Sequence, residues 1–270
     1  HHDVHTNHAF NCHRFCNFFN KIFIVTSLLL LLVVVGIYAG FDPTANSLHL
    51  GNLLILLCLK QFQQYGHNIT CVLGGATARI GDPSGKSKER NTIDNNIVIK
   101  NTKAIEQIIY KLLPNVQILN NNDWYNDMDI LSFNKKIGSY MRINDMLSKD
   151  SVNTRLKMNQ HGMSLTEFMY QSYQAYDFYY LNKYYNINVQ IGGSDQWGNI
   201  DSGINFIHKK KVKKKDNDHI YGLTIPLLTN SKGDKIGKTS NDNEKIKIWL
   251  DRNKTSAFKF YQYFYNLSDI

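Results

Sequence analysis

Two apolar runs joined by one helix place the strongest limit on the fold of this sequence. Residues 33–38 are rich in β-branched side chains and predict a buried strand. A helix is expected over residues 48–65, ended by Gly66, and a second strand over residues 69–73. Because a crossover helix joins strands that run in the same direction, this unit predicts a parallel sheet.

The rest of the chain continues the alternation of helices and strands. A capping box from Ser164 to Glu167 predicts the start of a long helix, and residues 125–160 are expected to form a mainly helical insertion or contact surface. The other expected elements are a helix near 97–112, strands near 116–120 and 187–191, a helix after residue 199, an apolar run at 221–228 and a helix over 256–266. This order predicts an α/β fold in which a Rossmann-like parallel sheet is flanked by helices.

Composition favours a folded domain that meets an anionic partner. With 43% apolar residues the chain can bury a core, which excludes wholesale disorder. Its net charge of +9 suggests nucleic acid, phosphates or acidic lipid. Cys58 and Cys71 are expected to be reduced core residues, and Cys12 and Cys16 lack a second ligand pair with the spacing of a zinc site. We expect no protein-bound metal and no disulfide scaffold.

The N-terminal segment, residues 1–35, differs from the rest of the chain. It is polar up to residue 21 and nearly all apolar from 22 to 35. If residues 33–38 form a strand, the remaining apolar stretch suits the hydrophobic part of a targeting leader better than a membrane anchor. The alternative is an artefact of the gene prediction. We expect no membrane association beyond such a leader.

One expected helix carries a polar stripe where apolar residues are usual. Tyr170, Gln174 and Asp177 stand at positions i, i+4 and i+7, so they share one helical face. An amphipathic helix normally keeps such a face apolar. The stripe therefore indicates a binding surface, and the competing interpretation is that these aromatic residues are core.

Four further segments follow expected strands, where parallel α/β sheets bind ligands. In the first, His49 and Asn52 lie in the first turn of a helix, where unpaired N–H groups attract anions, and Gly51 leaves room for a ligand. Ordinary helix-start chemistry explains them equally well. The second segment, residues 81–86 followed by Arg90, lacks the spacing of a P-loop.

The third and fourth segments add an acid and two lysines. Asp195 follows two glycines at a helix start, where an acid suits ribose hydroxyls. Lys235 and Lys238 stand three apart on a loop and could close over a polyphosphate, although lysines are common on surfaces.

Taken together and in this order, the segments closely resemble those of bacterial-type tyrosyl-tRNA synthetases, which are class I aminoacyl-tRNA synthetases. His49-Leu-Gly-Asn52 is similar to the class I HIGH signature, and Lys235-Ile-Gly-Lys238-Thr239 to its KMSKS partner. The resemblance extends over about residues 36–268. It implies a catalytic domain at 36–250 and, at 251–270, the start of a truncated helical anticodon-recognition domain.

The resemblance also assigns roles to individual residues. Asp177 and Tyr38 would hold the phenolic hydroxyl of tyrosine. A buried carboxylate that accepts a hydrogen bond from this hydroxyl would be left without a donor if phenylalanine were bound instead. The implied tyrosine-binding residues are Tyr38, Asp82, Tyr170, Gln174, Asp177, Gln190 and Gln196. The implied ATP-binding residues are Gly40, Asp42, Gly51, Gly193, Asp195 and Lys238. The implied catalytic residues are Thr44, His49, Asn52, Lys86, Arg90, Lys235, Lys238 and Thr239.

By the same resemblance the chain is expected to be a tyrosine–tRNA ligase. It would take L-tyrosine, ATP with Mg²⁺ and tRNA(Tyr) and act as a homodimer through the region near 125–160. It would work in a mitochondrion or plastid, or in the cytoplasm if the apolar N-terminus is an artefact. Asn52 replaces the second histidine of the signature and cannot carry charge, so adenylation is expected to be slower. The lysine-rich run 209–215 is either a solvated surface or a contact with the tRNA backbone.

Two alternatives remain open at this point. One is a tryptophan-specific relative, which the pair Asp177 and Tyr38 argues against because indole has no hydroxyl group. The other is a non-catalytic RNA-binding or membrane-tethered remnant, which the retained Lys235 and Lys238 argue against.

Overall fold

A five-stranded parallel sheet forms the centre of the molecule. The computed structural model describes residues 34–84, 92–158, 162–210, 219–228 and 247–265. The strand order is β3-β2-β1-β4-β5, and every neighbouring pair is parallel. The strands are β1 (Gly36–Phe41), β2 (Asn68–Leu73), β3 (Gln117–Asn120), β4 (Ile187–Gly193) and β5 (Tyr221–Ile225). The predicted parallel α/β sheet is therefore present.

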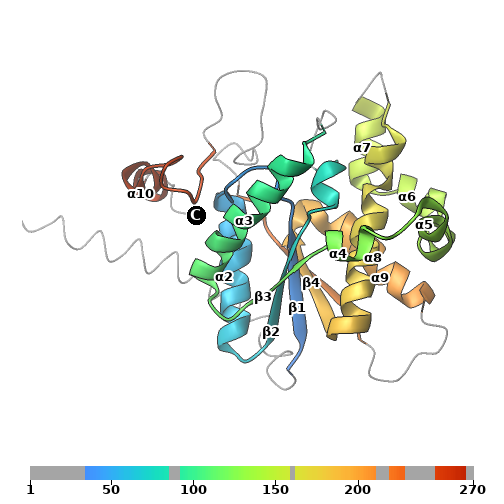
Figure 1. Ribbon diagram of the computed structural model, residues 1–270, viewed down its shortest axis with the longest axis horizontal. Coiled ribbons are helices and arrows are strands. Elements are labelled where there is room, and N and C mark those ends of the chain that lie inside the picture. The colour runs from blue at the N-terminus through green and yellow to red at the C-terminus, as the bar shows by residue number, and fades with distance from the viewer. Residues whose placement is uncertain (1–33, 85–91, 159–161, 211–218, 229–246, 266–270) are drawn as a thin grey trace, which may run out of the picture.

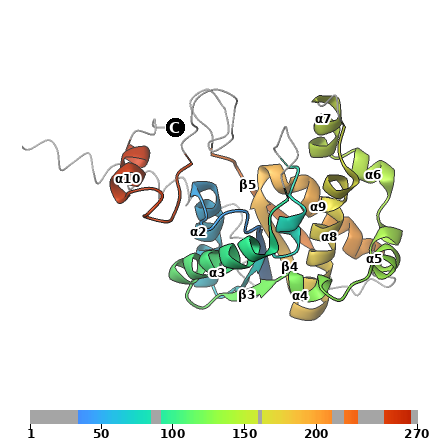
Figure 2. The ribbon, with the colours of Figure 1, turned by 45° about the horizontal axis from the view of Figure 1, so that its top comes forward.

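Helices cover both faces of this sheet (Figures 1 and 2). On one face lie α2 (Leu50–Gln64) and α3 (Asn95–Leu112), and on the other α8 (Leu165–Tyr185) and α9 (Trp197–Lys210). Alternation along β1 divides its side chains between these layers. Ile37 and Ala39 join the core beneath α2, whereas Tyr38 joins the aromatic core beneath α8. Strand β1 thereby points Tyr38 toward the helix that carries Asp177.

The ends of the long helices follow local sequence signals. Gly66, predicted to end the first helix, has a φ of 86°, a left-handed conformation that suits glycine. The side chain of Ser164 accepts a hydrogen bond of 3.2 Å from the backbone N–H of Glu167, as the capping box predicts. Asn186 ends α8 with a φ of 55°.

Short helices fill the region between β3 and α8, as predicted for residues 125–160. They are α4 (Asn122–Tyr125), α5 (Ile130–Lys136), η2 (Gly138–Tyr140), α6 (Ile143–Leu147) and α7 (Asp150–Met158), and a further short turn, η1 (Thr77–Arg79), follows β2. A buried ion pair joins α7 to α8, with Arg155 Nε 3.1 Å from a carboxylate oxygen of Glu167. This pair ties the helical region to the first turn of α8.

The last described segment returns to the start of α2. The backbone N–H of Leu50 donates to the carbonyl of Ile248, and that of Leu250 donates to the carbonyl of Leu48, each at 2.9 Å. Helix α10 (Ala257–Tyr265) follows, and Figure 1 shows it apart from the sheet. Among the helices of the described ranges, none has the length and apolarity needed to cross a membrane.

Two strands run further than the sequence predicts. Strand β1 spans residues 36–41 where the sequence predicted 33–38, and β4 spans residues 187–193 where it predicted 187–191. Gly40 pairs with Val72, and Gly192 pairs with Thr224, so the sheet itself holds these glycines extended. The physical reason is that pairing with one neighbouring strand, β2 for Gly40 and β5 for Gly192, outweighs the low strand propensity of glycine.

Candidate active site

The main cavity of the described structure opens where β1 and β4 end. Strand β1 lies between β2 and β4. The chain continues from β1 to β2 and β3 on one side, whereas β4 and β5 extend the sheet on the other side. The order of the strands therefore changes direction between β1 and β4. Open α/β sheets bind ligands at such a switch point. The cavity has a volume of about 330 Å³ and is lined from β1, β2, β4, α2, α8 and the segments that follow the strands.

Every described residue that the sequence assigned to the site lines this one cavity. The set comes from segments as distant as residues 38 and 196, so only the fold brings it together. These residues are Tyr38, Gly40, Asp42, Thr44, His49, Gly51, Asn52, Asp82, Tyr170, Gln174, Asp177, Gln190, Gly193, Asp195 and Gln196. The other predicted residues, Lys86, Arg90, Lys235, Lys238 and Thr239, lie outside the described ranges.

Asp177 lies at the buried end of the cavity and already has protein donors. Its side chain is on a residue that is 5% exposed. One carboxylate oxygen accepts from the indole N–H of Trp124 at 2.8 Å, and the other accepts from the amide of Asn121 at 3.1 Å. The expectation that phenylalanine would strand this carboxylate is therefore wrong as stated. A carboxylate offers about four lone-pair directions, so a substrate hydroxyl can still add a further hydrogen bond.

Burial governs the protonation of the groups at this end. It raises the pKa of Asp177 to about 7, while the hydrogen bonds from Asn121, Trp124 and Tyr125 act in the opposite direction. Burial, followed by the nearby charge of Asp177, also raises the pKa of Tyr38 well above its usual value. Tyr38 is therefore a neutral phenol beside a carboxyl group that titrates near neutral pH.

Two buried polar atoms of the cavity wall lack a partner within the described structure. They are the hydroxyl of Tyr38 and the side-chain oxygen of Gln190, on residues that are 1% and 2% exposed. A buried polar group without a hydrogen bond is costly. Both atoms therefore favour a polar ligand in the cavity.

In the middle of the cavity, two hydrogen bonds join residues of the predicted site to each other. The hydroxyl of Tyr170 donates to a carboxylate oxygen of Asp42 at 2.8 Å. The amide of Gln196 donates to Asp82 at 2.6 Å. Burial, followed by the charges of Asp42 and Asp82, raises the pKa of Tyr170 well above its usual value. The first contact joins a residue assigned to tyrosine to one assigned to ATP, and the second joins two residues assigned to tyrosine.

A chain of hydrogen bonds between lining residues connects the two ends of the cavity. The hydroxyl of Thr77 donates to Asp42 at 2.7 Å, and the amide of Asn121 contacts both Thr77 Oγ1 at 3.0 Å and Asp177 at 3.1 Å. Sequence reasoning missed Thr77, Asn121 and Trp124. Their position directly after expected strands was the available signal, since each follows β2 or β3.

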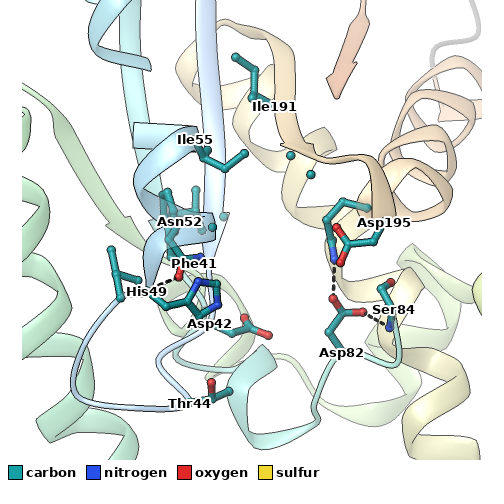
Figure 3. A pocket seen from close by; sticks show the side chains of 18 of the residues that line it. Phe41, Asp42, Thr44, His49, Asn52, Ile55, Asp82, Ser84, Ile191 and Asp195 are labelled. Atoms are coloured by element: carbon teal, nitrogen blue, oxygen red, sulfur yellow. Dashed lines mark hydrogen bonds between the residues drawn. The ribbon is translucent and has the colours of Figure 1, made fainter. Parts of the chain in front are cut away.

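The first turn of α2 forms another wall. Figure 3 shows His49, Asn52 and Asp42 across the cavity from Asp82, Ser84 and Asp195. The side-chain oxygen of Asn52 accepts from the backbone N–H of His49 at 3.1 Å. With that oxygen engaged, Asn52 can offer a ligand its amide N–H groups, which are donors.

Carboxylates are common in this cavity, but they do not gather into a metal site. Within the described ranges, no three His, Cys, Asp or Glu side chains are grouped as metal ligands would be. Cys12 and Cys16 of the N-terminal segment lie outside those ranges.

The family comparison agrees with this arrangement. A family profile described as tRNA synthetases class I (W and Y) matches residues 33–270. The chain belongs to this family.

Curated proteins similar in sequence to this chain are named tyrosine–tRNA ligases. A tyrosine–tRNA ligase of Blochmanniella pennsylvanica is 47% identical over 245 residues, covering 87% of this chain and 55% of that protein. The chloroplastic/mitochondrial tyrosine–tRNA ligase of Arabidopsis thaliana is 48% identical over 241 residues, covering 87% and 46%. The chain thus spans about half the length of the curated relatives it matches.

Solved structures lead to the same family. A C-terminally truncated mitochondrial tyrosyl-tRNA synthetase from Aspergillus nidulans superimposes with a TM-score of 0.72 at 34% identity, covering 87% of this chain and 68% of that chain. The resemblance to tyrosyl-tRNA synthetases is confirmed, and so is the class I catalytic fold.

Proposed function

We propose that this chain is the catalytic part of a tyrosine–tRNA ligase. It would activate L-tyrosine with ATP and pass the tyrosyl group to the 3′-terminal ribose of tRNA(Tyr). The observation that carries the proposal is the meeting of all fifteen described candidate residues at one switch-point cavity. The identity of 46–48% to several tyrosine–tRNA ligases supports the same conclusion.

The buried end of the cavity suits the amino acid. Asp177 and Tyr38 would hold the phenolic hydroxyl, which can donate to the carboxylate while accepting from the phenol of Tyr38. Asp82, Tyr170 and Gln174 would surround the ammonium group, because a carboxylate and neutral oxygens stabilise a cation there. Gln190 and Gln196 would lie close to the reacting carboxyl group.

The other end of the cavity suits the nucleotide. The nucleotide would lie along Gly40, Asp42, Thr44 and Gly51. His49 and Asn52 would donate hydrogen bonds to its phosphates at the positive end of α2. The ribose would meet Gly193 and Asp195. Mg²⁺ would arrive with ATP, since this ion keeps much of its water and binds through phosphates.

The chemistry needs no covalent enzyme intermediate. The carboxylate of tyrosine would attack the α-phosphorus of ATP in line, so that pyrophosphate leaves and tyrosyl-adenylate stays bound. A ribose hydroxyl of the tRNA would then attack the carbonyl, releasing AMP. The protein would act by positioning and by stabilising the charge on the phosphoryl oxygens. Lys86, Arg90, Lys235, Lys238 and Thr239 are the proposed cationic and polar groups for that task.

The tRNA would approach near the end of α9, whose last turn carries Lys209 and Lys210. Two lysines of the run 209–215 already have protein contacts: Lys209 lies 2.9 Å from a carboxylate oxygen of Asp145, and Lys210 lies 3.9 Å from the ring centre of Tyr140. We therefore assign the proposed backbone contact to the later lysines of the run. Replacing Lys213, Lys214 and Lys215 by Glu should reduce the salt dependence of tRNA binding, and an unchanged salt slope would contradict this assignment.

We also propose a homodimer built on the helical region. Ile130 and Leu131 on α5 are 71% and 76% exposed, and large apolar side chains in one exposed area often mark an interface. Sedimentation of wild type and of Leu131→Glu tests the proposal. The wild type should sediment as a dimer and the variant should shift toward monomer.

We propose that the protein functions in an organelle. The support is the plant relative named chloroplastic/mitochondrial and the fungal mitochondrial structure, set against bacterial relatives of similar identity. Fusion of residues 1–40 to a fluorescent protein should direct it to a mitochondrion or plastid, and a diffuse signal would contradict this.

Amino-acid-dependent ATP–pyrophosphate exchange tests the central proposal. Exchange with tyrosine but not with phenylalanine or tryptophan is the expected result. Exchange with tryptophan instead would assign the chain to the other branch of its family. No exchange with any of the three would indicate a non-catalytic remnant.

A further inference from the structure

Lys247 lies on the cavity wall, beyond the residues that the sequence assigned to the site. Lys247 directly precedes the residues that pair with the start of α2, where His49 and Trp249 form an antiparallel bridge. Side chains alternate along such an extended segment. Ile248 is buried at 4% exposure, whereas its neighbours Lys247 and Trp249 both face the cavity.

The segment is firmly attached, so the position of Lys247 is set by the fold. Besides the two backbone hydrogen bonds to Leu48 and Leu50, the backbone N–H of Asp251 donates to Ser47 Oγ at 3.1 Å. The backbone N–H of Trp249 donates to the hydroxyl of Thr255 at 2.9 Å. These bonds fix the chain on both sides of the indole ring.

The indole ring holds the lysine. Lys247 Nζ lies 5.0 Å from the ring centre of Trp249, within the range of a cation–π interaction. The same ring lies 6.5 Å from the imidazole of His49. The ammonium group is therefore kept beside the first turn of α2, where the positive end of the helix dipole also favours an anion.

The charges of the residues around the cavity indicate what this lysine would bind. Its described lining includes the carboxyl groups of Asp42, Asp82, Asp177 and Asp195, and Lys247 is the single lysine or arginine among those described lining residues. A polyphosphate entering so acidic a cavity needs cations close to its own charges.

We propose that Lys247 is a further ATP-binding residue that contacts the β- and γ-phosphates, with Trp249 as its positioning residue. This assignment rests on the proposed function for the identity of the nucleotide. The contact is an ion pair between the ammonium group and phosphate oxygens at the α2 end of the cavity.

Equilibrium binding of MgATP and of AMP to the whole chain tests this assignment. AMP carries the nucleoside and the α-phosphate but lacks the two outer phosphates. Lys247→Met should weaken MgATP binding by roughly 10-fold, the effect of one charge-assisted hydrogen bond, and leave AMP binding within about 2-fold. Lys247→Arg should retain most of the affinity for MgATP.

Lys254 provides a matched control. Its ammonium group lies 4.6 Å from the same indole ring, yet Lys254 does not line the cavity. Lys254→Met should therefore leave both affinities unchanged. If both variants weaken MgATP equally, the effect comes from the indole environment and the assignment is wrong.

Other outcomes also decide the question. Unchanged MgATP affinity in Lys247→Met, an equal loss of AMP affinity, or a loss confined to tRNA binding would each overturn the assignment. The binding assay does not depend on the reaction. A chain that binds MgATP through Lys247 but shows no tyrosine-dependent exchange would overturn the proposed function and leave this assignment standing.

Discussion

The indole N–H of Trp124 lies 2.8 Å from a carboxylate oxygen of Asp177. This contact stabilises the ionised form of a carboxyl group that burial would otherwise keep neutral. Trp124 also stacks on Tyr180 with ring centres 4.6 Å apart, which fixes the direction of its N–H. The charge state of Asp177 thus depends on an aromatic residue on a different helix.

Trp124→Phe tests that dependence. The substitution should retain most of the apolar contact with Tyr180 but remove the donor, so the pKa of Asp177 should rise above its present value. We expect weaker tyrosine binding at pH 7 and partial recovery at pH 8.5, measured as the KM for tyrosine in pyrophosphate exchange. Tyr180→Phe, which leaves the indole donor in place, should show no such pH-dependent recovery.

Asp177→Asn and Asp177→Ala should differ in stability. Either change removes the carboxylate proposed to bind the substrate hydroxyl, so the preference for tyrosine over phenylalanine should fall sharply in exchange assays. Asp177→Ala also leaves the buried donors of Trp124 and Asn121 without a partner, at about 1–3 kcal/mol each. Asn retains an acceptor oxygen and should lose less. Equal free energies of unfolding for the two variants in urea would contradict this account.

The KM for tyrosine should depend on pH through Asp177. Its pKa of about 7 means that the carboxylate is lost as pH falls below that value. We therefore expect the KM for tyrosine to rise between pH 7.5 and pH 6, and Asp177→Asn to remove this rise. The stability effect has the opposite sign. A raised native pKa stabilises the fold at low pH, and that contribution should disappear as pH rises from about 4 to 7.

Tyr38→Phe should separate affinity from stability. The hydroxyl of Tyr38 is buried and has no partner in the described structure, so removing it should leave the free energy of unfolding unchanged or raise it. Binding of tyrosine should weaken by roughly 10-fold if this hydroxyl contacts the substrate phenol. A large loss of stability measured by denaturation would show that the hydroxyl has a structural role instead.

The buried pair Arg155 and Glu167 offers a test of how α8 is held. Arg155→Met should lower the free energy of unfolding by about 3–5 kcal/mol, because it leaves the Glu167 carboxylate buried and unpaired. Adding Glu167→Gln should recover part of this loss. The measurement is urea denaturation of both variants. A double variant less stable than Arg155→Met alone would contradict the pairing argument.

The sequence predicted the arrangement of the sheet better than the details of the site. The unit from residue 33 to residue 73 fixes parallel strands because its helix must cross over, and glycine at 66 marks the helix end. Strand ends were less predictable, since glycine has a low strand propensity and yet Gly40 and Gly193 are paired in the sheet.

Within the site, single residues were easier to predict than their contacts. Asp177 stood out because an acid on a helical stripe is unusual. Its donor Trp124 could not be identified in the same way, since a tryptophan after a strand is usually core. Lys247 gave no signal either, because only the pairing of residues 48–50 with 248–250 brings it to the cavity.

The hydrogen-bonded chain through Asp42, Thr77, Asn121 and Asp177 has a consequence for redesign. An engineer who replaces Asp177 to admit a different aromatic amino acid also removes the acceptor for Asn121, whose amide reaches Thr77 and, through it, Asp42. Nucleotide binding would then weaken because of a substitution made to change the amino-acid specificity. Libraries that randomise Thr77 and Asn121 together with Asp177 should yield more productive variants than libraries confined to the ring-binding end.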